Sequence, residues 1–140
     1  MKKILYLIVV LSIVGIVGSS CRVRPINGDL DGHWQLMIVE TPHSTINPQS
    51  TYYAFYRHIA NLRPNGPTAN LTYDENTNCL TLDFPEGCWI EYPDTDNNSL
   101  EAFYIPRKTP CTLKFKIIKL TSKQLIMTLD DTITYTFRKF

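Results

Sequence analysis

The sequence predicts an all-β protein, an antiparallel up-and-down barrel of about seven or eight strands. Apolar and polar residues alternate along much of the chain, which is typical of strands with one buried face, and no convincing run repeats every 3.6 residues. Short polar connections separate these alternating runs. A closed barrel is favoured over an open sheet because it leaves no unpaired strand edge. We therefore expect little helix.

The first predicted strand begins at Trp34 and ends before Pro42. Its alternation places Leu36 and Ile38 on one face and Gln35, Met37 and Val39 on the other. Residues 52–62 are rich in aromatic side chains and fit either a strand or a short helix. Two prolines and a glycine in residues 61–67 require a turn there.

The second half of the chain predicts a series of antiparallel hairpins. Residues 70–73 and 79–84 flank a polar connection and form the first hairpin. Three β-rich runs, residues 112–120, 124–129 and 132–140, form a meander. In the last of them Ile133, Tyr135 and Phe137 share one face. Two short strands are expected at residues 89–92 and 100–105, with a rim loop at 94–99 between them.

The N-terminus has the pattern of an export signal. Lys2 and Lys3 precede an apolar run, residues 4–17, and small residues lead into Cys21. This pattern resembles a bacterial lipoprotein signal, which implies cleavage after residue 20 and a lipid on Cys21. Gly18 stands where such signals carry an aliphatic residue, so an uncleaved anchor or ordinary cleavage near residue 20 stays open. The apolar run is shorter than the roughly twenty residues that span a bilayer.

We expect three segments: a signal peptide at residues 1–20, a lipid-anchored tether at 21–31 and one barrel domain at 32–140. About 120 residues suffice for a single core. In the surface-exposed lipoproteins that this N-terminus resembles, acidic residues follow the cysteine. The basic Arg22 and Arg24 depart from that pattern, so the resemblance implies a location on the periplasmic side of the cell envelope. The formal net charge is +1, and acidic and basic residues are interspersed along the chain. Because the sequence has no stripe of basic residues, we expect no nucleic-acid partner.

Catalytic and metal-binding patterns are scarce. The three histidines lack metal-ligand spacing, and neither a Gly-x-Ser-x-Gly elbow nor a phosphate-binding glycine loop occurs. Residues 94–105 begin like a calcium loop but lack its glycine and its final glutamate. We therefore expect no enzyme activity, no metal site and no cofactor.

Two local motifs resemble those of lipocalins. Gly32 and Trp34 form a Gly-x-Trp at the start of the first strand, and Arg138 lies in the last strand. In lipocalins the indole lies across the closed barrel end and a basic residue packs over it, a role that the resemblance assigns to Arg138. Residues 120–125 and 135–138 are similar to those of small lipocalin-like lipoproteins of Gram-negative gut bacteria. The Thr-Asp-Tyr motif of classical lipocalins is absent.

The barrel and its aromatic residues suggest binding of a small apolar or amphipathic ligand. The expected ligand-site residues are Tyr53, Phe55, Arg57, His58, Trp89 and Tyr104. The alternative is a protein-interaction or envelope-assembly module, in which the barrel is packed solid and an envelope protein is the partner.

Two further features belong to an exported protein. An oxidising compartment permits a disulfide, for which we prefer Cys79 with Cys88 and leave Cys88 with Cys111 open. Asp131, Thr132 and Ile133 weakly resemble a site that some gut bacteria O-glycosylate, and a plain two-residue hairpin turn accounts for the aspartates without it.

Overall fold

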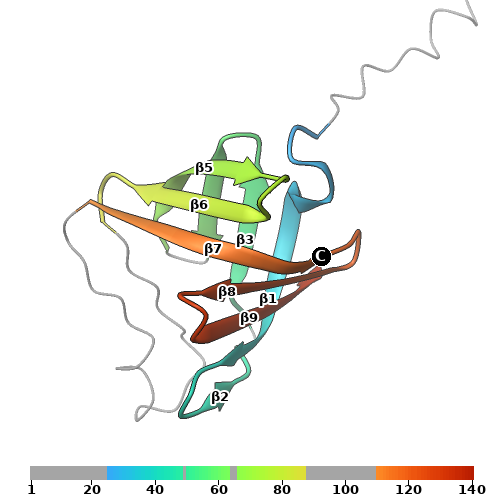
Figure 1. The fold of residues 1–140 in the computed structure, drawn as a ribbon, viewed down its shortest axis with the longest axis vertical. Coiled ribbons are helices and arrows are strands. Elements are labelled where there is room, and N and C mark those ends of the chain that lie inside the picture. The colour runs from blue at the N-terminus through green and yellow to red at the C-terminus, as the bar shows by residue number, and fades with distance from the viewer. Residues whose placement is uncertain (1–24, 49, 64–65, 88–109) are drawn as a thin grey trace, which may run out of the picture.

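The computed structural model describes residues 25–48, 50–63, 66–87 and 110–140 (Figure 1). One short 3₁₀ helix, η1 (Gly28–Leu30), precedes the strands. The strands within the described residues are β1 (Gly32–Glu40), β2 (Thr45–Ile46), β3 (Tyr52–Tyr56), β4 (Ile59–Arg63), β5 (Thr68–Asp74), β6 (Cys79–Phe84), β7 (Cys111–Leu120), β8 (Gln124–Leu129) and β9 (Ile133–Lys139). The expected strands at 89–92 and 100–105 and the loop at 94–99 lie outside the described residues.

The strands form one antiparallel sheet that closes on itself. Strands β1 and β3 to β9 pair in sequence order, and β9 pairs back onto β1, so that eight strands form a barrel. The two-residue β2 pairs only with the end of β1. In Figure 1 the strands curve around one interior, with the blue N-terminal segment at one end and β2 at the other. The predicted all-β antiparallel barrel is confirmed.

A bulge in β1 corrects the predicted faces of that strand. The pairing of β1 with β9 shifts between Leu36 and Ile38. Trp34, Leu36 and Val39 are therefore buried, whereas Ile38 is only half-buried. The prediction that Leu36 and Ile38 share a face was wrong, because one extra residue in a bulge reverses the alternation that follows it.

The aromatic segment at residues 52–62 forms a β-hairpin rather than a single element. Strands β3 and β4 pair from Tyr52 with Arg63 to Tyr56 with Ile59. Arg57 and His58 make the two-residue turn, and Arg57 has a φ of 55°. Glycine, asparagine and aspartate are the residues that usually signal such a turn. Their absence here explains why the sequence pattern did not reveal it.

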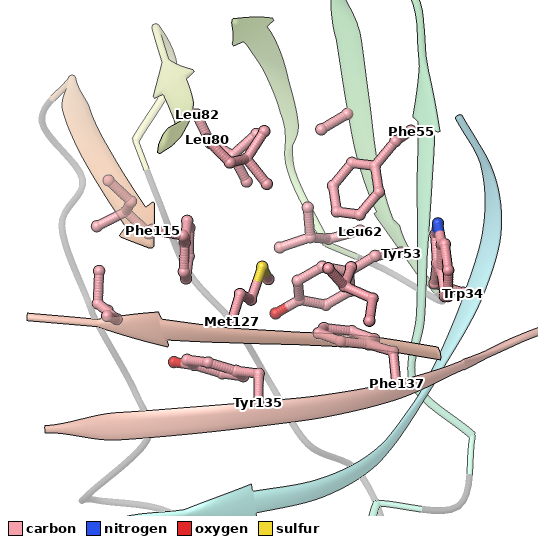
Figure 2. Packing of buried hydrophobic residues seen from close by; sticks show 14 of the residues in the cluster. Trp34, Tyr53, Phe55, Leu62, Leu80, Leu82, Phe115, Met127, Tyr135 and Phe137 are labelled. Atoms are coloured by element: carbon pink, nitrogen blue, oxygen red, sulfur yellow. The ribbon is translucent and has the colours of Figure 1, made fainter. Parts of the chain in front are cut away.

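Apolar side chains point into the interior from strands on all sides of the barrel (Figure 2). The ring centroids of Tyr53 and Phe137 lie 5.0 Å apart, and those of Phe115 and Tyr135 lie 5.8 Å apart. Tyr135 and Phe137 are buried on β9 as the alternation predicted, and Ile133 packs against the cluster. The expected hairpin of β5 and β6 and the meander of β7 to β9 are also confirmed.

The two ends of the barrel differ in construction. We call one the closed end: it carries η1, the turns at residues 57–58, 75–78 and 121–123, and the C-terminus. We call the other the distal end: there β1 and β6 end, β7 begins, and residues 130–131 connect β8 to β9. Within the described ranges, no helix has the length and apolar character needed to cross a membrane.

Candidate functional site

Trp34 forms the floor of the barrel at the closed end. Its side chain is fully buried, and its Nε1 donates a hydrogen bond of 2.8 Å to the carbonyl oxygen of Leu30. Leu30, the last residue of η1, is also fully buried. The indole therefore fixes the short helix across the opening, since a buried N–H needs an acceptor.

Lys139 covers the indole from the last strand. Its Nζ lies 4.5 Å from the centroid of the Trp34 ring and donates hydrogen bonds of 2.6 Å to the carbonyl oxygens of Asp29 and Asp31. Partial burial lowers the pKa of this ammonium group below 10.5, while the negative charges of Asp29 and Asp31 act against the lowering. The cation thus connects β9, η1 and the indole.

The predicted role of Arg138 was wrong by one residue. Arg138 is exposed, and its Nε donates a hydrogen bond of 2.8 Å to Oε1 of Gln35 on the outer face. Trp34 pairs with Lys139, and Gln35 pairs with Arg138. Residues opposite one another in a ladder share a face, so the basic residue on the side of Trp34 is Lys139.

Gly32 gives Lys139 the space that it occupies. A Cβ atom at Gly32 would lie 2.7 Å from Cε of Lys139. The φ of Gly32 is +135°, a conformation that side-chain-bearing residues rarely adopt. The glycine of the Gly-x-Trp motif therefore permits both the backbone path into β1 and the close approach of the lysine.

Residues 27–31 belong to the folded body, so the predicted tether at 21–31 ends too late. The Nδ2 atom of Asn27 donates hydrogen bonds of 2.7 Å to Oδ1 of Asp31 and to the carbonyl oxygen of Arg57. The backbone N–H of Arg57 donates to the same carboxylate at 3.2 Å. These bonds tie η1 to the β3–β4 turn. The low apolar content of this segment concealed the burial of Leu30.

The barrel interior holds two of the predicted ligand-site residues. Tyr53 and Phe55 are buried on β3, with ring centroids 6.2 Å apart. Figure 2 shows the phenol groups of Tyr53 and Tyr135 pointing away from Trp34, on the side of the interior that holds Phe115 and Met127. The interior therefore has an apolar floor at the indole and polar atoms farther from it.

Thr51 adds a polar atom that the sequence did not point out. It lies two residues before Tyr53, is 2% exposed, and its Oγ1 has no hydrogen-bond partner. Its backbone carbonyl accepts a hydrogen bond of 2.9 Å from the N–H of Leu36. A hydroxyl next to a strand normally finds a backbone or solvent partner, so no local sequence signal distinguishes Thr51 from other threonines.

Arg57 and His58 do not join the interior residues. Both are exposed in the turn at the closed end. Their predicted place in a ligand site with Tyr53 and Phe55 was wrong, because the strand alternation stops at Tyr56 and the chain reverses outside the barrel wall. Trp89 and Tyr104 lie outside the described residues.

The predicted disulfide between Cys79 and Cys88 was also wrong. Cys79 is a free, half-buried thiol, whereas Cys111 is disulfide-bonded. Cys79 pairs with Lys116 and Cys111 pairs with Phe84, so the two cysteines lie at opposite ends of the β6–β7 ladder. The chain leaves β6 at the Cys111 end, about 17 Å from Cys79 at ~3.3 Å per residue. Cys88 itself lies outside the described residues.

Thr132 occupies the turn at the distal end. It follows Asp130 and Asp131, whose φ values are 52° and 54°, and its hydroxyl donates a hydrogen bond of 3.3 Å to the carbonyl oxygen of Leu129. The side chain is exposed. O-glycosylation of Thr132 stays a prediction. In the part of the chain that the structure describes, no three His, Cys, Asp or Glu side chains form a group that could hold a metal ion.

Comparison with known families agrees with this geometry. The model of the family described as "Lipocalin-like domain" matches residues 15–140. The chain belongs to the lipocalin-like domain family. The Gly-x-Trp motif, the helix across the closed end and the basic residue over the indole are thus features of a lipocalin-like barrel in this chain.

Two solved structures share the fold of this lipocalin-like chain. A lipocalin-like protein from Bacteroides uniformis matches with a TM-score of 0.55 and 20% identity, over 81% of this chain and 100% of its own. An uncharacterized protein from Bacteroides eggerthii matches with a TM-score of 0.53 and 19% identity, over 79% of this chain and 98% of its own. A search of curated proteins found no match. Identities this low support a shared fold only, so the function has to be argued from the site itself.

Proposed function

We propose that this lipocalin-like protein is a cell-envelope lipoprotein, tethered through Cys21, whose barrel binds a small apolar or amphipathic ligand. The observation that carries the proposal is the unpartnered hydroxyl of Thr51 in the apolar interior. Ligand sites combine mostly apolar walls with a few polar groups that orient the ligand. Tyr53, two residues from Thr51, and Phe55, farther along the same buried face of β3, supply an apolar wall.

The energetic argument concerns the cost of an unsatisfied hydroxyl. A buried polar group without a partner costs about 1–3 kcal/mol. Thr51 would recover this cost if a ligand oxygen or nitrogen met its Oγ1. A ligand with an apolar body and one polar group matches this arrangement, whereas a fully polar ligand would leave its other groups unsatisfied against Phe55 and Leu36.

Binding, rather than catalysis, is the activity we infer from the buried polar residues. Among the described residues these are Asn27, Gln35 and Thr51. General acid–base catalysis needs a titratable group within hydrogen-bond reach of the substrate. Asn27 and Gln35 form hydrogen bonds outside the barrel interior. The hydroxyl of Thr51 does not titrate near neutral pH, so it can orient a ligand without transforming it.

The test is mass spectrometry of the full chain purified from its own host in mild detergent. Native spectra followed by denaturation would identify a reproducible small apolar molecule at one per chain if the binding proposal holds. The denatured mass also reports a lipid on Cys21. An empty chain that co-purifies with an envelope protein would contradict ligand binding and favour the interaction module.

A further inference from the structure

Among the described residues, the large apolar side chains that are most exposed lie at the closed end of the barrel. Five large hydrophobic residues in the described part of the chain are 52–78% exposed. We call them the closed-end patch: Ile26, Tyr56, Ile59, Ile118 and Phe140. Single exposed apolar residues are ordinary on any surface, but a concentration at one end indicates a contact.

The pairings place each member of the patch. Tyr56 pairs with Ile59 beside the β3–β4 turn, and Ile26 precedes Asn27, which bonds that turn. The N–H of Phe140 donates a hydrogen bond of 2.9 Å to the carbonyl oxygen of His33.

The remaining member, Ile118, lies two residues before the end of β7. The turn that follows β7 is bonded to the C-terminal strand, because the N–H of Lys139 donates to the carbonyl oxygen of Lys123 at 2.9 Å. Ile118 is therefore near the closed end too.

The distal end has the opposite character. Its described surface is polar and carries exposed carboxylates, namely Glu40, Asp83, Glu86, Asp130 and Asp131. Among the described residues it offers no apolar side chain as exposed as Tyr56 or Phe140.

The start of the described chain lies at the same end as the patch. Pro25 precedes η1 and is separated from Cys21 by four peptide links. Four links span at most about 14 Å. A lipid on Cys21 would therefore hold Pro25, and with it the start of the closed end, within that distance of the membrane surface.

We propose that the closed end of the barrel rests on the membrane, with the closed-end patch inserted among the lipid headgroups and the outermost acyl segments. This inference rests on the proposed tether through Cys21. Amphipathic aromatic residues such as Tyr56 favour this interfacial region. The distal end, with its carboxylates, then faces the aqueous phase, and a ligand reaches the interior from the side away from the membrane.

Charge plays a smaller part than apolar contact in this docking. Arg57, Lys119 and Lys123 are exposed at the closed end and can meet lipid phosphates. Asp74 and Glu75 are exposed in a turn of the same end and oppose this attraction. The anchor and the apolar side chains therefore set the orientation, and salt should weaken it only slightly.

The experiment measures the depth of nitroxide labels on the full, lipidated chain in vesicles of phosphatidylethanolamine and phosphatidylglycerol. A Cys79→Ser background removes the free thiol. Labels are placed at Tyr56→Cys and Ile59→Cys in the patch and at Asp130→Cys as the matched control at the distal end. We expect collisions with a water-soluble nickel chelate to fall several-fold at the two patch positions on vesicle binding, collisions with oxygen to rise there, and both to stay unchanged at Asp130→Cys.

Three outcomes would overturn the inference. Patch labels that stay as accessible to the chelate as the control, on a chain whose mass includes the lipid, refute the docking and leave the tether intact. If the patch labels are protected from the chelate in native envelopes but not in vesicles of purified lipid, the patch binds a protein partner instead of lipid. An unmodified Cys21 refutes the tether and the docking together, and the mass of the chain distinguishes this failure from the first.

Discussion

The ammonium group of Lys139 lies 4.5 Å from the centroid of the Trp34 ring, while its hydrogen bonds reach the carbonyl oxygens of Asp29 and Asp31. One side chain of the last strand thus joins the first strand and the helix that precedes it. Closure of a barrel requires its first and last strands to be held in register, and this contact lies at the seam where β1 meets β9.

Truncation of the floor residue tests the closure. Trp34→Ala should lower the free energy of unfolding by about 3–5 kcal/mol, because it opens a cavity beside the core and leaves the carbonyl of Leu30 without its donor. Denaturant unfolding with an unchanged m-value measures the loss. The exposed Tyr56→Ala is the control and should shift the midpoint little. Equal shifts for the two variants would show that the indole does not close the core.

A methyl group at Gly32 tests the space for Lys139. Gly32→Ala should cost about 1–3 kcal/mol, since it forces a side chain onto a φ of +135° and crowds Cε of Lys139. Lys139→Ala in the same chain should recover the part of the loss that comes from crowding, giving a non-additive double-mutant cycle. Gly28→Ala is the matched control, because its φ is +57° and no atom lies within 4 Å of the added Cβ. A strictly additive cycle at Gly32 would refute the contact.

These details mark what the sequence could and could not predict. The tryptophan at the closed end was predictable, since Gly32 and Trp34 form a local motif. The identity of the cation was predictable too, because the alternation that puts Tyr135 and Phe137 on the inner face of the last strand also puts Lys139 there and Arg138 outside. The choice of Arg138 followed the resemblance instead of this local pattern. Leu30 is a lone apolar residue in a polar stretch, and only its packing under the barrel reveals that it is buried.

The same division holds for the candidate site. The alternation of β3 predicted the inward side chains of Tyr53 and Phe55, because strand periodicity is a local property. Arg57 and His58 were misplaced since a two-residue turn without glycine ends the strand just before them. Thr51 was missed because an unpartnered hydroxyl is defined by what surrounds it in space.

Removal of the bonded cysteine should distinguish it from the free one. Under oxidising conditions Cys111→Ser should lower the free energy of unfolding by about 2–4 kcal/mol, because the cross-link no longer restricts the unfolded chain. Cys79→Ser should change the denaturation midpoint little, and reductant should destabilise this variant as much as the native chain. We expect peptide mapping to identify Cys88 as the partner of Cys111. Alkylation of Cys111 in the native, unreduced protein would contradict the prediction.

The β5–β6 turn should make the stability of the fold depend on pH in the acidic range. The pKa of Asp74 is held below 3.8, chiefly by a hydrogen bond from the side chain of Thr77 and also by the N–H of Asn76, which donates at 3.0 Å. A carboxyl group with a lowered pKa stabilises the fold above its unfolded value, and this contribution is lost as pH falls through the folded pKa.

The measurement is the denaturation midpoint as a function of pH. Asp74→Asn and Thr77→Val should each flatten its decline below pH 3.8 relative to the native chain, because the first removes the titrating group and the second its main donor. Parallel acid limbs for all three chains would contradict this assignment.

Replacement of the unpartnered hydroxyl links stability to binding. Thr51→Val keeps the shape of the side chain and removes Oγ1, so the ligand-free chain should become more stable by about 1–3 kcal/mol. The same variant should retain less of the small molecule that co-purifies with the native chain, because the polar group that orients it is gone. Thermal unfolding of the emptied protein and the ligand-to-chain ratio in native spectra measure the two effects. Thr72→Val on the outer surface is the control and should change neither. A variant that loses stability without its ligand would mean that the hydroxyl is satisfied in solution, and undiminished retention would remove Thr51 from the ligand site.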